Sequence, residues 1–303
     1  MLNEKSMRVA ICIPTTQNRF KDLLGRLNVL SNKYDIYVFI TNGDYEKYNY
    51  AAYGWGGRIQ VMLTDAETIY KKREVMRNVM IERCYTHIIM IDDDISTKAG
   101  IITAESKRPT SESYHINHID ITELFDKMIS YGHENAEVGF VSPALPHFLG
   151  FSKPGRVQKN HAINFGQCVL VNLTKLLEAD IHYDTSGNIN EDVDLVFQML
   201  KKGIECHTLY DYCFFNHSRN DESTTCPFNQ QSRLHVNMYL KYKDALRLRV
   251  DKKGIIQFTP VYKYIYDYAD TYVKDDKYTA ELYRICLSDD DETIKNYILS
   301  KKK

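Results

Sequence analysis

Two groups of carboxylate side chains in this sequence could do chemistry. Asp92, Asp93 and Asp94 are adjacent, and Glu191 and Asp192 open a second acidic run further along the chain. Three adjacent carboxylates repel one another, so they are best tolerated where a cation or solvent offsets their charge. Carboxylate oxygens are the hard ligands that Mg²⁺ and Mn²⁺ prefer, and such an ion can carry a diphosphate. The triplet is therefore a candidate metal and nucleotide site.

The two acidic groups together indicate a group-transfer reaction. In an extended segment Asp92 and Asp94 share one side while Asp93 faces the other. A metal ion there would neutralise a leaving diphosphate as a Lewis acid, and a separate carboxylate could deprotonate an acceptor hydroxyl as a general base. Each group also has a plainer interpretation. The triplet alone could be a solvated turn, and Glu191 and Asp192 could simply favour a helix N-terminus.

The elements that must position these groups are predicted from apolar periodicity. Buried strands are expected at 8–14, 36–42, 58–65 and 87–91, and helices at 20–30 and 67–84. Strands alternating with helices predict an α/β fold with a mostly parallel twisted sheet flanked by helices. In such sheets ligands bind beyond the carboxyl ends of the strands. Polar groups follow three of these strands: Thr15 to Arg19, Asn42 to Asp44, and the acidic triplet.

The rest of the chain predicts an acceptor half and an appendage. Residues 96–118 are polar and turn-rich, as in a surface excursion. A helix is expected at 121–132, strands at 138–143, 167–172 and 210–217, and a helix after Glu191 that ends at Gly203. From about 235 the pattern is helical and rich in lysine and tyrosine. We therefore expect a domain at 1–234, with a nucleotide-binding half at 1–95 and an acceptor half at 96–234, followed by a helical region at 235–303.

The composition excludes several classes of protein. The formal net charge is −1, so no global field draws the chain to nucleic acid or to anionic membranes. The seven cysteines are odd in number and form no C-x-x-C pair, which argues against a disulfide framework. A zinc site from Cys206, Cys213, His217 and Cys226 would fit no common spacing. No apolar run approaches the ~20 residues of a membrane span, so a soluble, cytoplasmic enzyme is expected.

The ordered set of motifs resembles the GT-A fold glycosyltransferases. The lines that carry the resemblance are HIIMIDDDI, NEDVDLVFQMLKKG, the pair Arg77-Asn78 and the opening IPTTQNR, which together cover roughly residues 8–217. The resemblance implies that Asp94 binds Mn²⁺ or Mg²⁺ directly and that Asp92 or Asp93 contacts ribose or a metal-bound water. His217 would complete the metal shell beside Asp94 and Asp92. Asp192 would be the base of an inverting enzyme, with Glu191 binding the acceptor or orienting Asp192.

The same resemblance implies a nucleotide-sugar donor, with a UDP-sugar as the first choice. Arg19, Arg73 and Arg77 could neutralise its phosphates. Lys71, Lys72 and Arg73 could equally form a solvated helix face, an interpretation favoured for the two lysines. The residues expected to bind the donor are Pro14, Thr15, Thr16, Arg19, Asn42, Arg73, Arg77, Asn78, Asp92 and Asp93.

A narrower resemblance concerns the acceptor. The compact N-terminal half, the triple aspartate and a composition typical of AT-rich phage genomes are similar to the phage, TET-associated glycosyltransferases of hydroxymethylated pyrimidines in DNA. This implies 5-hydroxymethylcytosine in double-stranded DNA as acceptor, in the host cytoplasm if the gene belongs to a phage. Basic segments that could hold DNA are Lys107-Arg108, Lys153 to Lys159, and Lys241 to Lys263. The tyrosines at 262, 264, 266 and 268 could equally pack the appendage.

Three other functions remain open at this point. The acceptor could be a cell-surface glycan or a lipid-linked saccharide. A nucleotidyltransferase would also place aspartates on a metal ion at strand ends, although the segment Glu191 to Leu195 argues against it. The carboxylates could also be purely structural in a nucleotide-binding or DNA-binding module.

Overall fold

The chain forms two compact units in this computed structural model. The first contains Met1–Tyr183 and Ile204–Ser218, and the second contains Asp184–Gly203 and Arg219–Lys303. Each unit is described by itself below. The domain boundary expected near residue 235 stays a prediction. The structure describes residues 7–15, 30, 33–41, 58–104, 114–144, 157–159, 167–216, 228–242, 245–250, 256–260 and 291–300.

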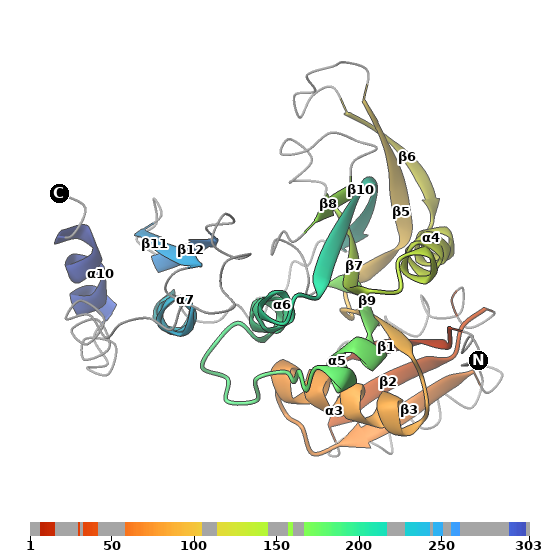
Figure 1. Ribbon diagram of the computed structural model, residues 1–303, viewed down its shortest axis with the longest axis horizontal. Helices are drawn as coiled ribbons and strands as arrows, with labels where there is room; N and C mark the ends of the chain where they lie inside the picture. The colour runs from red at the N-terminus through yellow and green to blue at the C-terminus, as the bar shows by residue number, and fades with distance from the viewer. Residues whose placement is uncertain are drawn as a thin grey trace. The chain divides into compact units, whose positions relative to one another are not determined.

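The first unit is built on one large sheet (Figure 1). Its strand order is β3-β2-β1-β4-β9-β7-β10-β5-β6, and β8 pairs with β10. The strands are β1 (Val9–Pro14), β2 (Ile36–Thr41), β3 (Ile59–Thr64), β4 (His87–Ile91), β5 (Ile95–Ala104), β6 (Tyr114–Asp120), β7 (Val138–Ala144), β8 (Val157–Lys159), β9 (Cys168–Asn172) and β10 (Glu205–Asn216).

The sheet is mostly parallel, as predicted. Strands β3, β2, β1, β4, β7, β10 and β6 run in one direction, whereas β9, β5 and β8 run against them. The half formed by β3, β2, β1 and β4 is wholly parallel. The carboxyl ends of these four strands therefore lie at one edge of the sheet.

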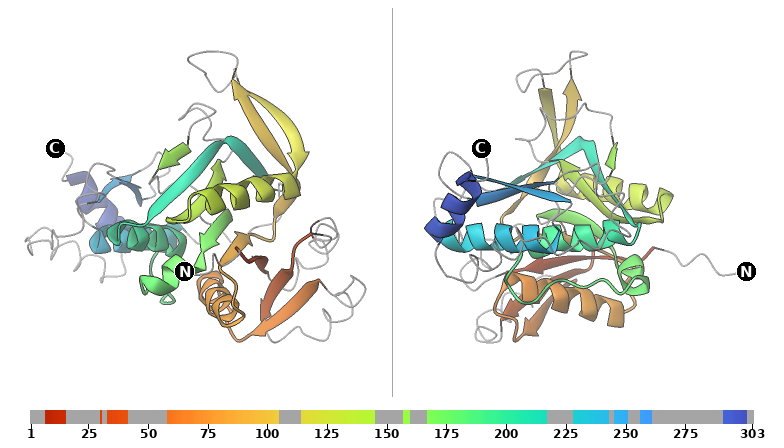
Figure 2. Two further views of the ribbon diagram at one scale, coloured as in Figure 1. Left: turned by 45° about the vertical axis from the view of Figure 1, so that its right-hand side comes forward. Right: turned by 60° about the vertical axis from the view of Figure 1, so that its left-hand side comes forward.

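Alternate residues of these strands build the core. Ile11 and Ile13 of β1 and Ile89 and Ile91 of β4 belong to one cluster, which also contains Phe125 of helix α4 (Ile121–Glu134). Helix α4 packs against β5 and β7, and it lies beside β5 in Figure 1 and in the left view of Figure 2. It begins at Asp120, whose carboxylate accepts from the N–H of Thr122, the usual way of satisfying a free N–H at a helix start.

Two expectations for the first unit were wrong. Residues 96–118, expected to be a surface excursion, contain most of an antiparallel ladder between β5 and β6, whose partners include Ala99 and Ile119. Helix α3 (Ile69–Glu82) agrees with the helix expected at 67–84, but its apolar pattern, Ile69, Val75, Val79 and Met80, predicts a buried stripe that fails at Ile69, which is 41% exposed. Its buried residues are Lys72, Arg73, Met76, Arg77 and Met80. The buried face is partly cationic because these basic side chains have acceptors close by.

The second unit contains the helix of the second acidic group and the C-terminal elements. Helix α6 (Glu191–Lys201) ends before Gly203, which has a φ of +75° suited to glycine. Helices α7 (Phe228–Lys241) and α10 (Asp291–Ser300) agree with the predicted helical appendage. A hairpin of β11 (Leu246–Val250) and β12 (Ile256–Pro260) was not predicted. Among the described helices none is long and apolar enough to cross a membrane.

Candidate donor and acceptor residues

The triplet lies directly beside the end of β1. Strands β1 and β4 are parallel neighbours, with Ile11 opposite Ile89 and Cys12 opposite Met90. Because this register places Thr15 level with Asp93, Thr15 follows β1 at the same edge where the aspartates follow β4. Both strands are buried in the core, and this fixes the position of the polar groups that follow them. Two of the three polar strand ends predicted from the sequence are thereby brought together. The third, at Asn42, lies outside the described residues.

Asp93 ties the two strand ends together. Its carboxylate accepts a buried hydrogen bond of 2.9 Å from the hydroxyl of Thr15. The ammonium of Lys72, on α3, donates to the backbone carbonyl of Thr15 at 2.7 Å. Burial lowers the pKa of Lys72, and the charge of Asp93 opposes that effect. The solvated-face interpretation is therefore wrong for Lys72, although Lys71 is exposed as expected.

Asp92 faces the helix instead. The guanidinium of Arg73, which is buried, donates to the carboxylate of Asp92 at 3.2 Å. The pKa of Asp92 is raised to about 6, chiefly by burial and also by the charges of Asp94 and Asp93, while Arg73 opposes the shift. Three adjacent carboxylates thus lie beside the cationic side chains of Lys72 and Arg73, a setting that suits an added cation.

The residues at this edge suit a divalent cation in their chemistry. Three carboxylates supply hard oxygens of the type that Mn²⁺ and Mg²⁺ take. Among the described residues, however, no group of three or more His, Cys, Asp or Glu side chains is arranged to hold a metal ion. The expected third ligand, His217, lies outside the described residues, as do the donor residues Thr16 and Arg19. An ion here would have to take further oxygens from a diphosphate or from water.

Arg77 lies on the same helix, and one nitrogen of its guanidinium forms no hydrogen bond within the described part of the chain. It is only 3% exposed, and its guanidinium donates to the side-chain oxygen of Asn78 at 2.6 Å and to Glu74 at 3.5 Å. The Nε of Arg77 is buried and has no hydrogen-bond partner within the described part of the chain. Buried polar atoms are nearly always paired in proteins, so this N–H has capacity for an acceptor that a ligand would bring.

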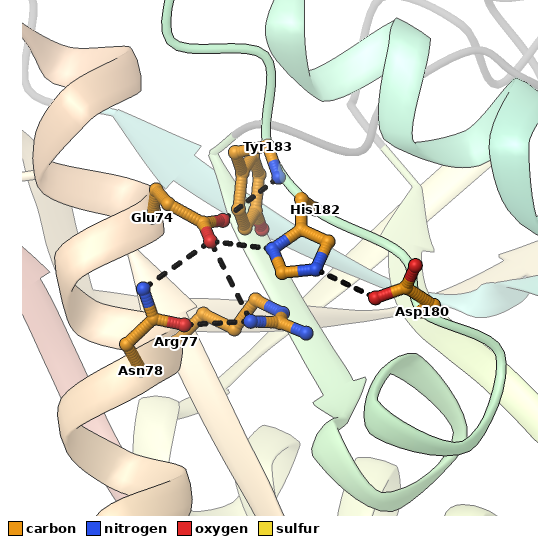
Figure 3. A network of polar contacts seen from close by, with 6 residues as sticks. All are labelled: Glu74, Arg77, Asn78, Asp180, His182 and Tyr183. Atoms are coloured by element: carbon orange, nitrogen blue, oxygen red, sulfur yellow. Dashed lines mark hydrogen bonds and ion pairs between the residues drawn. The ribbon is translucent and has the colours of Figure 1, made fainter.

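Glu74 was not predicted as a site residue, yet it lies at the centre of a network of polar contacts (Figure 3). Its carboxylate accepts from Arg77 and Asn78 on its own helix. It also accepts from the Nδ1 of His182 at 2.8 Å and from the backbone N–H of Tyr183 at 2.9 Å. The other ring nitrogen of His182 contacts Asp180 at 3.0 Å. Three consecutive residues of α3 thus contact β1, the triplet and the segment that precedes Asp184.

The second acidic group lies in the first turn of α6. Asn190 precedes this helix and gives no side-chain cap, so Glu191 and Asp192 supply the negative charge that a helix N-terminus favours. The Asp192 carboxylate accepts from the backbone N–H of Val193 at 2.8 Å. Both side chains remain partly exposed and can meet a ligand.

Asp194, in the same motif, has a structural role. It is fully buried and receives the hydroxyl of Tyr242 at 2.5 Å and the ammonium of Lys241 at 2.7 Å. The Gln198 amide binds its other oxygen at 2.7 Å. These contacts attach α6 to the end of α7. Removing one partner of such a buried pair is costly because it leaves the other charge uncompensated.

Of the four residues in the zinc alternative, the structure describes Cys206 and Cys213. Cys206 and Cys213 are free thiols, both fully buried, and burial raises the pKa of each. Cys213 packs in a hydrophobic cluster with Ile102 and Tyr210. Cys206 and Cys213 are therefore core residues.

We expect the contact between Glu74 and His182 to make stability depend on pH. The hydrogen bond that His182 donates to Glu74 raises the pKa of His182 above its ordinary value of ~6.5. A raised folded-state pKa contributes stability below about pH 6.5, and this contribution disappears as the pH rises through the folded-state pKa. The free energy of unfolding in urea should be larger for the native chain than for His182→Gln at pH 5.5. This difference should shrink as the pH rises to 8.5. The same substitution at exposed His133 is the control, and a constant difference across the range would refute the expectation.

The comparisons with known proteins agree with this geometry. The family model described as TET-Associated Glycosyltransferase matches residues 9–223. The crystal structure of TarS residues 1–349 from S. aureus in complex with UDP-GlcNAc aligns with a TM-score of 0.51 at 9% identity, over 98% of this chain and 92% of that one. The mannosyltransferase PcManGT from Pyrobaculum calidifontis, in complex with GDP-Man and Mn²⁺, aligns with a TM-score of 0.50 at 12% identity, over 96% and 85%.

A search of curated proteins finds no match. The structural neighbours share the fold at low identity, and they confirm the predicted GT-A-like architecture. The family model covers most of the chain, including the triplet and the second acidic group. The chain therefore belongs to the TET-associated glycosyltransferase family and is a glycosyltransferase.

Proposed function

We propose that this enzyme transfers a sugar from a nucleotide-sugar donor, with a divalent cation, to a hydroxyl group on DNA, and that the transfer inverts the anomeric centre. The observation that supports donor binding is the group of contacts at the sheet edge, where the triplet bonds Thr15 and Arg73. The solved structures with the same fold that contain UDP-GlcNAc or GDP-Man with Mn²⁺ support a nucleotide sugar and a metal ion.

The donor would lie against α3 and the ends of β1 and β4. Pro14 and Thr15 end β1, and the spare N–H of Arg77 is available to an acceptor atom of the donor. Arg73 and Arg77 carry fixed positive charge, and a guanidinium fork matches phosphate oxygens. We assign Asn78 and Asp93 to fixing these groups, because each bonds a residue of this set. Thr16, Arg19 and Asn42 stay predictions from the sequence.

Mn²⁺ or Mg²⁺ would be held by Asp94, with Asp92 close by and His217 as the further ligand. When bound, the ion supplies positive charge to the departing diphosphate. The chain's own contribution is to orient the carboxylates. Arg73 does this for Asp92, and the hydroxyl of Thr15 does it for Asp93.

Asp192 would take the proton from the acceptor hydroxyl as that oxygen bonds to the sugar and the nucleoside diphosphate leaves. Glu191, one residue earlier, would orient the acceptor. The partial exposure of both side chains in the first turn of α6 supports these roles, while buried Asp194 holds the helix to α7. The family's name supports a modified base as acceptor. We propose 5-hydroxymethylcytosine, whose free hydroxyl is a suitable nucleophile.

We expect Asp94→Ala to lower donor turnover by at least about 100-fold, because a metal ion contributes several kcal/mol of charge stabilisation at a leaving diphosphate. Mn²⁺ binding, followed by electron paramagnetic resonance in the presence of UDP, should weaken in parallel. Glu123→Ala, which removes an exposed carboxylate in the first turn of α4, is the matched control. Unchanged Mn²⁺ binding and turnover in Asp94→Ala would show that the metal is held elsewhere.

Asp192→Asn is predicted to separate chemistry from donor binding. General base catalysis is worth about 10²–10⁴-fold, so transfer should fall by that factor while the donor Kd changes less than about twofold. Calorimetry gives the Kd, and release of nucleoside diphosphate with acceptor present gives the rate. A full transfer rate in this variant would remove Asp192 from the mechanism.

The acceptor is tested by incubating the enzyme with Mn²⁺, a panel of UDP- and GDP-sugars, and duplex DNA containing 5-hydroxymethylcytosine. Nucleoside mass spectrometry should then detect a hexosyl or pentosyl mass increase on that base. Duplexes with cytosine or 5-methylcytosine, which lack the hydroxyl, are the controls. Donor hydrolysis without any mass increase on DNA would reject this acceptor and favour a glycan or lipid-linked saccharide.

A further inference from the structure

The basic segments singled out in the sequence are not equivalent in the structure. Lys159, in the segment from Lys153, forms an ion pair with Glu205 at 3.1 Å. Lys241 is committed to buried Asp194, and Tyr242 packs on Phe197 with its ring centroid 4.8 Å away. Lys107-Arg108 and residues 153–156 lie outside the described residues. The positive charges of Lys159 and Lys241 are therefore already neutralised by carboxylates.

Arg247 and Arg249 differ from these. They are exposed and lie two residues apart on β11. Neither forms an ion pair within the described ranges. Arg249 donates to the side-chain oxygen of Gln257 on β12 at 2.9 Å, a neutral partner that orients the guanidinium without cancelling its charge. A guanidinium carries five N–H donors, so most of them remain available.

The hairpin has two different faces. Leu248, Val250 and Ile256 pack with Val236 of α7 and Ile294 of α10. The backbone carbonyl of Ile256 accepts from His235 of α7 at 2.7 Å, which fixes the hairpin on that helix. Because side chains alternate along a strand, Arg247 and Arg249 share the opposite face.

The register of the hairpin defines that second face. Arg247 lies opposite Thr259, and Arg249 lies opposite Gln257. These four positions carry two positive charges and no negative one. A merely solvated face usually mixes both signs of charge. The sequence between the strands, Asp251 to Ile255, contributes Lys252 and Lys253 against one aspartate, so the residues 246–260 carry a net positive charge in a chain whose formal net charge is −1.

We propose that this face of the β11–β12 hairpin, which we name the arginine ribbon (Arg247, Arg249 and Gln257), binds the phosphate backbone of duplex DNA. The proposal rests on the proposed function, because it takes the acceptor to be DNA. Residues two apart on a strand are separated by about 6.8 Å, so the two guanidinium groups can each reach a different phosphate. Arginine forks bind phosphate oxygens with two parallel hydrogen bonds, and two-stranded ribbons are known to dock on DNA.

Contacts to phosphates position DNA without reading its sequence. The arginine ribbon would therefore hold any duplex, and recognition of the modified base would remain with the catalytic residues. Each phosphate contact releases a counterion, so the logarithm of the binding constant should depend on the logarithm of salt concentration with a slope of about −0.9 per contact. The proposal thus predicts that replacing these arginines changes the slope of the salt dependence. If the arginines only stabilised the hairpin, this slope would not change.

The test measures duplex binding by fluorescence anisotropy between 50 and 300 mM KCl, for the full chain and for Arg247→Gln/Arg249→Gln. The slope should become shallower by about 1.8, equally for duplexes with and without 5-hydroxymethylcytosine. Affinity at 0.1 M salt should fall on the order of 50-fold. Arg247→Lys/Arg249→Lys, which keeps the charge, should recover most of the slope, and donor hydrolysis should be unchanged in all variants.

Lys98→Gln/Lys127→Gln is the matched control, because it removes two exposed charges from β5 and α4. A slope change in the arginine variant no larger than in this control would overturn the proposal. If the native chain modifies DNA but the arginine variant keeps its slope, the proposed function stands and the ribbon assignment fails. If the native chain neither binds nor modifies DNA, the proposed acceptor fails, and the ribbon assignment fails with it.

Discussion

Carboxylates at the end of a buried strand are costly unless cations and hydroxyl groups face them, and the donor half of this enzyme is organised around that requirement. Strand β4 is apolar until Ile91 and then presents three aspartates. Thr15 at the end of β1 bonds Asp93, and Arg73 of α3 bonds Asp92. Burial is the main cause that raises the pKa of Asp92 to about 6, and the charges of the neighbouring aspartates add to it. The triplet thus forms an acidic edge of the kind that the proposed cation would fit.

Helix α3 links this site to the rest of the first unit. Lys72 contacts β1, Arg73 contacts the triplet, and Glu74 contacts the segment at His182 and Tyr183. A small shift of this helix would disturb all three contacts together. In the second unit Asp194 plays a comparable part, because it attaches α6, which begins with Glu191 and Asp192, to the end of α7. Both acidic motifs thus combine carboxylates available for chemistry with polar groups that hold their helix or strand in position.

Much of the fold around the proposed donor site could be predicted from the sequence, because an apolar run that ends in polar residues is typical of a buried strand. Strand β4, which ends at the triplet, is the clearest case. The roles of the aspartates stay predictions. The cationic buried face of α3 could not be predicted, since lysine and arginine are normally exposed and the acceptors of Lys72 and Arg73 come from distant segments. Glu74 could not be predicted either, because its partners His182 and Tyr183 are distant in the sequence. The β11–β12 hairpin did carry a signal: the alternation in Leu-Arg-Leu-Arg-Val is typical of a half-buried strand.

The central claim is that the edge formed by β1, β4 and α3 binds the nucleotide sugar through a metal ion. Anomalous diffraction from crystals grown with Mn²⁺ and a UDP-sugar tests it most directly. The account predicts a single strong manganese peak within about 2.0–2.3 Å of a carboxylate oxygen of Asp94, with the diphosphate between the ion and α3. A nucleotide bound without manganese near the triplet, or a manganese peak bound by other residues, would contradict the account.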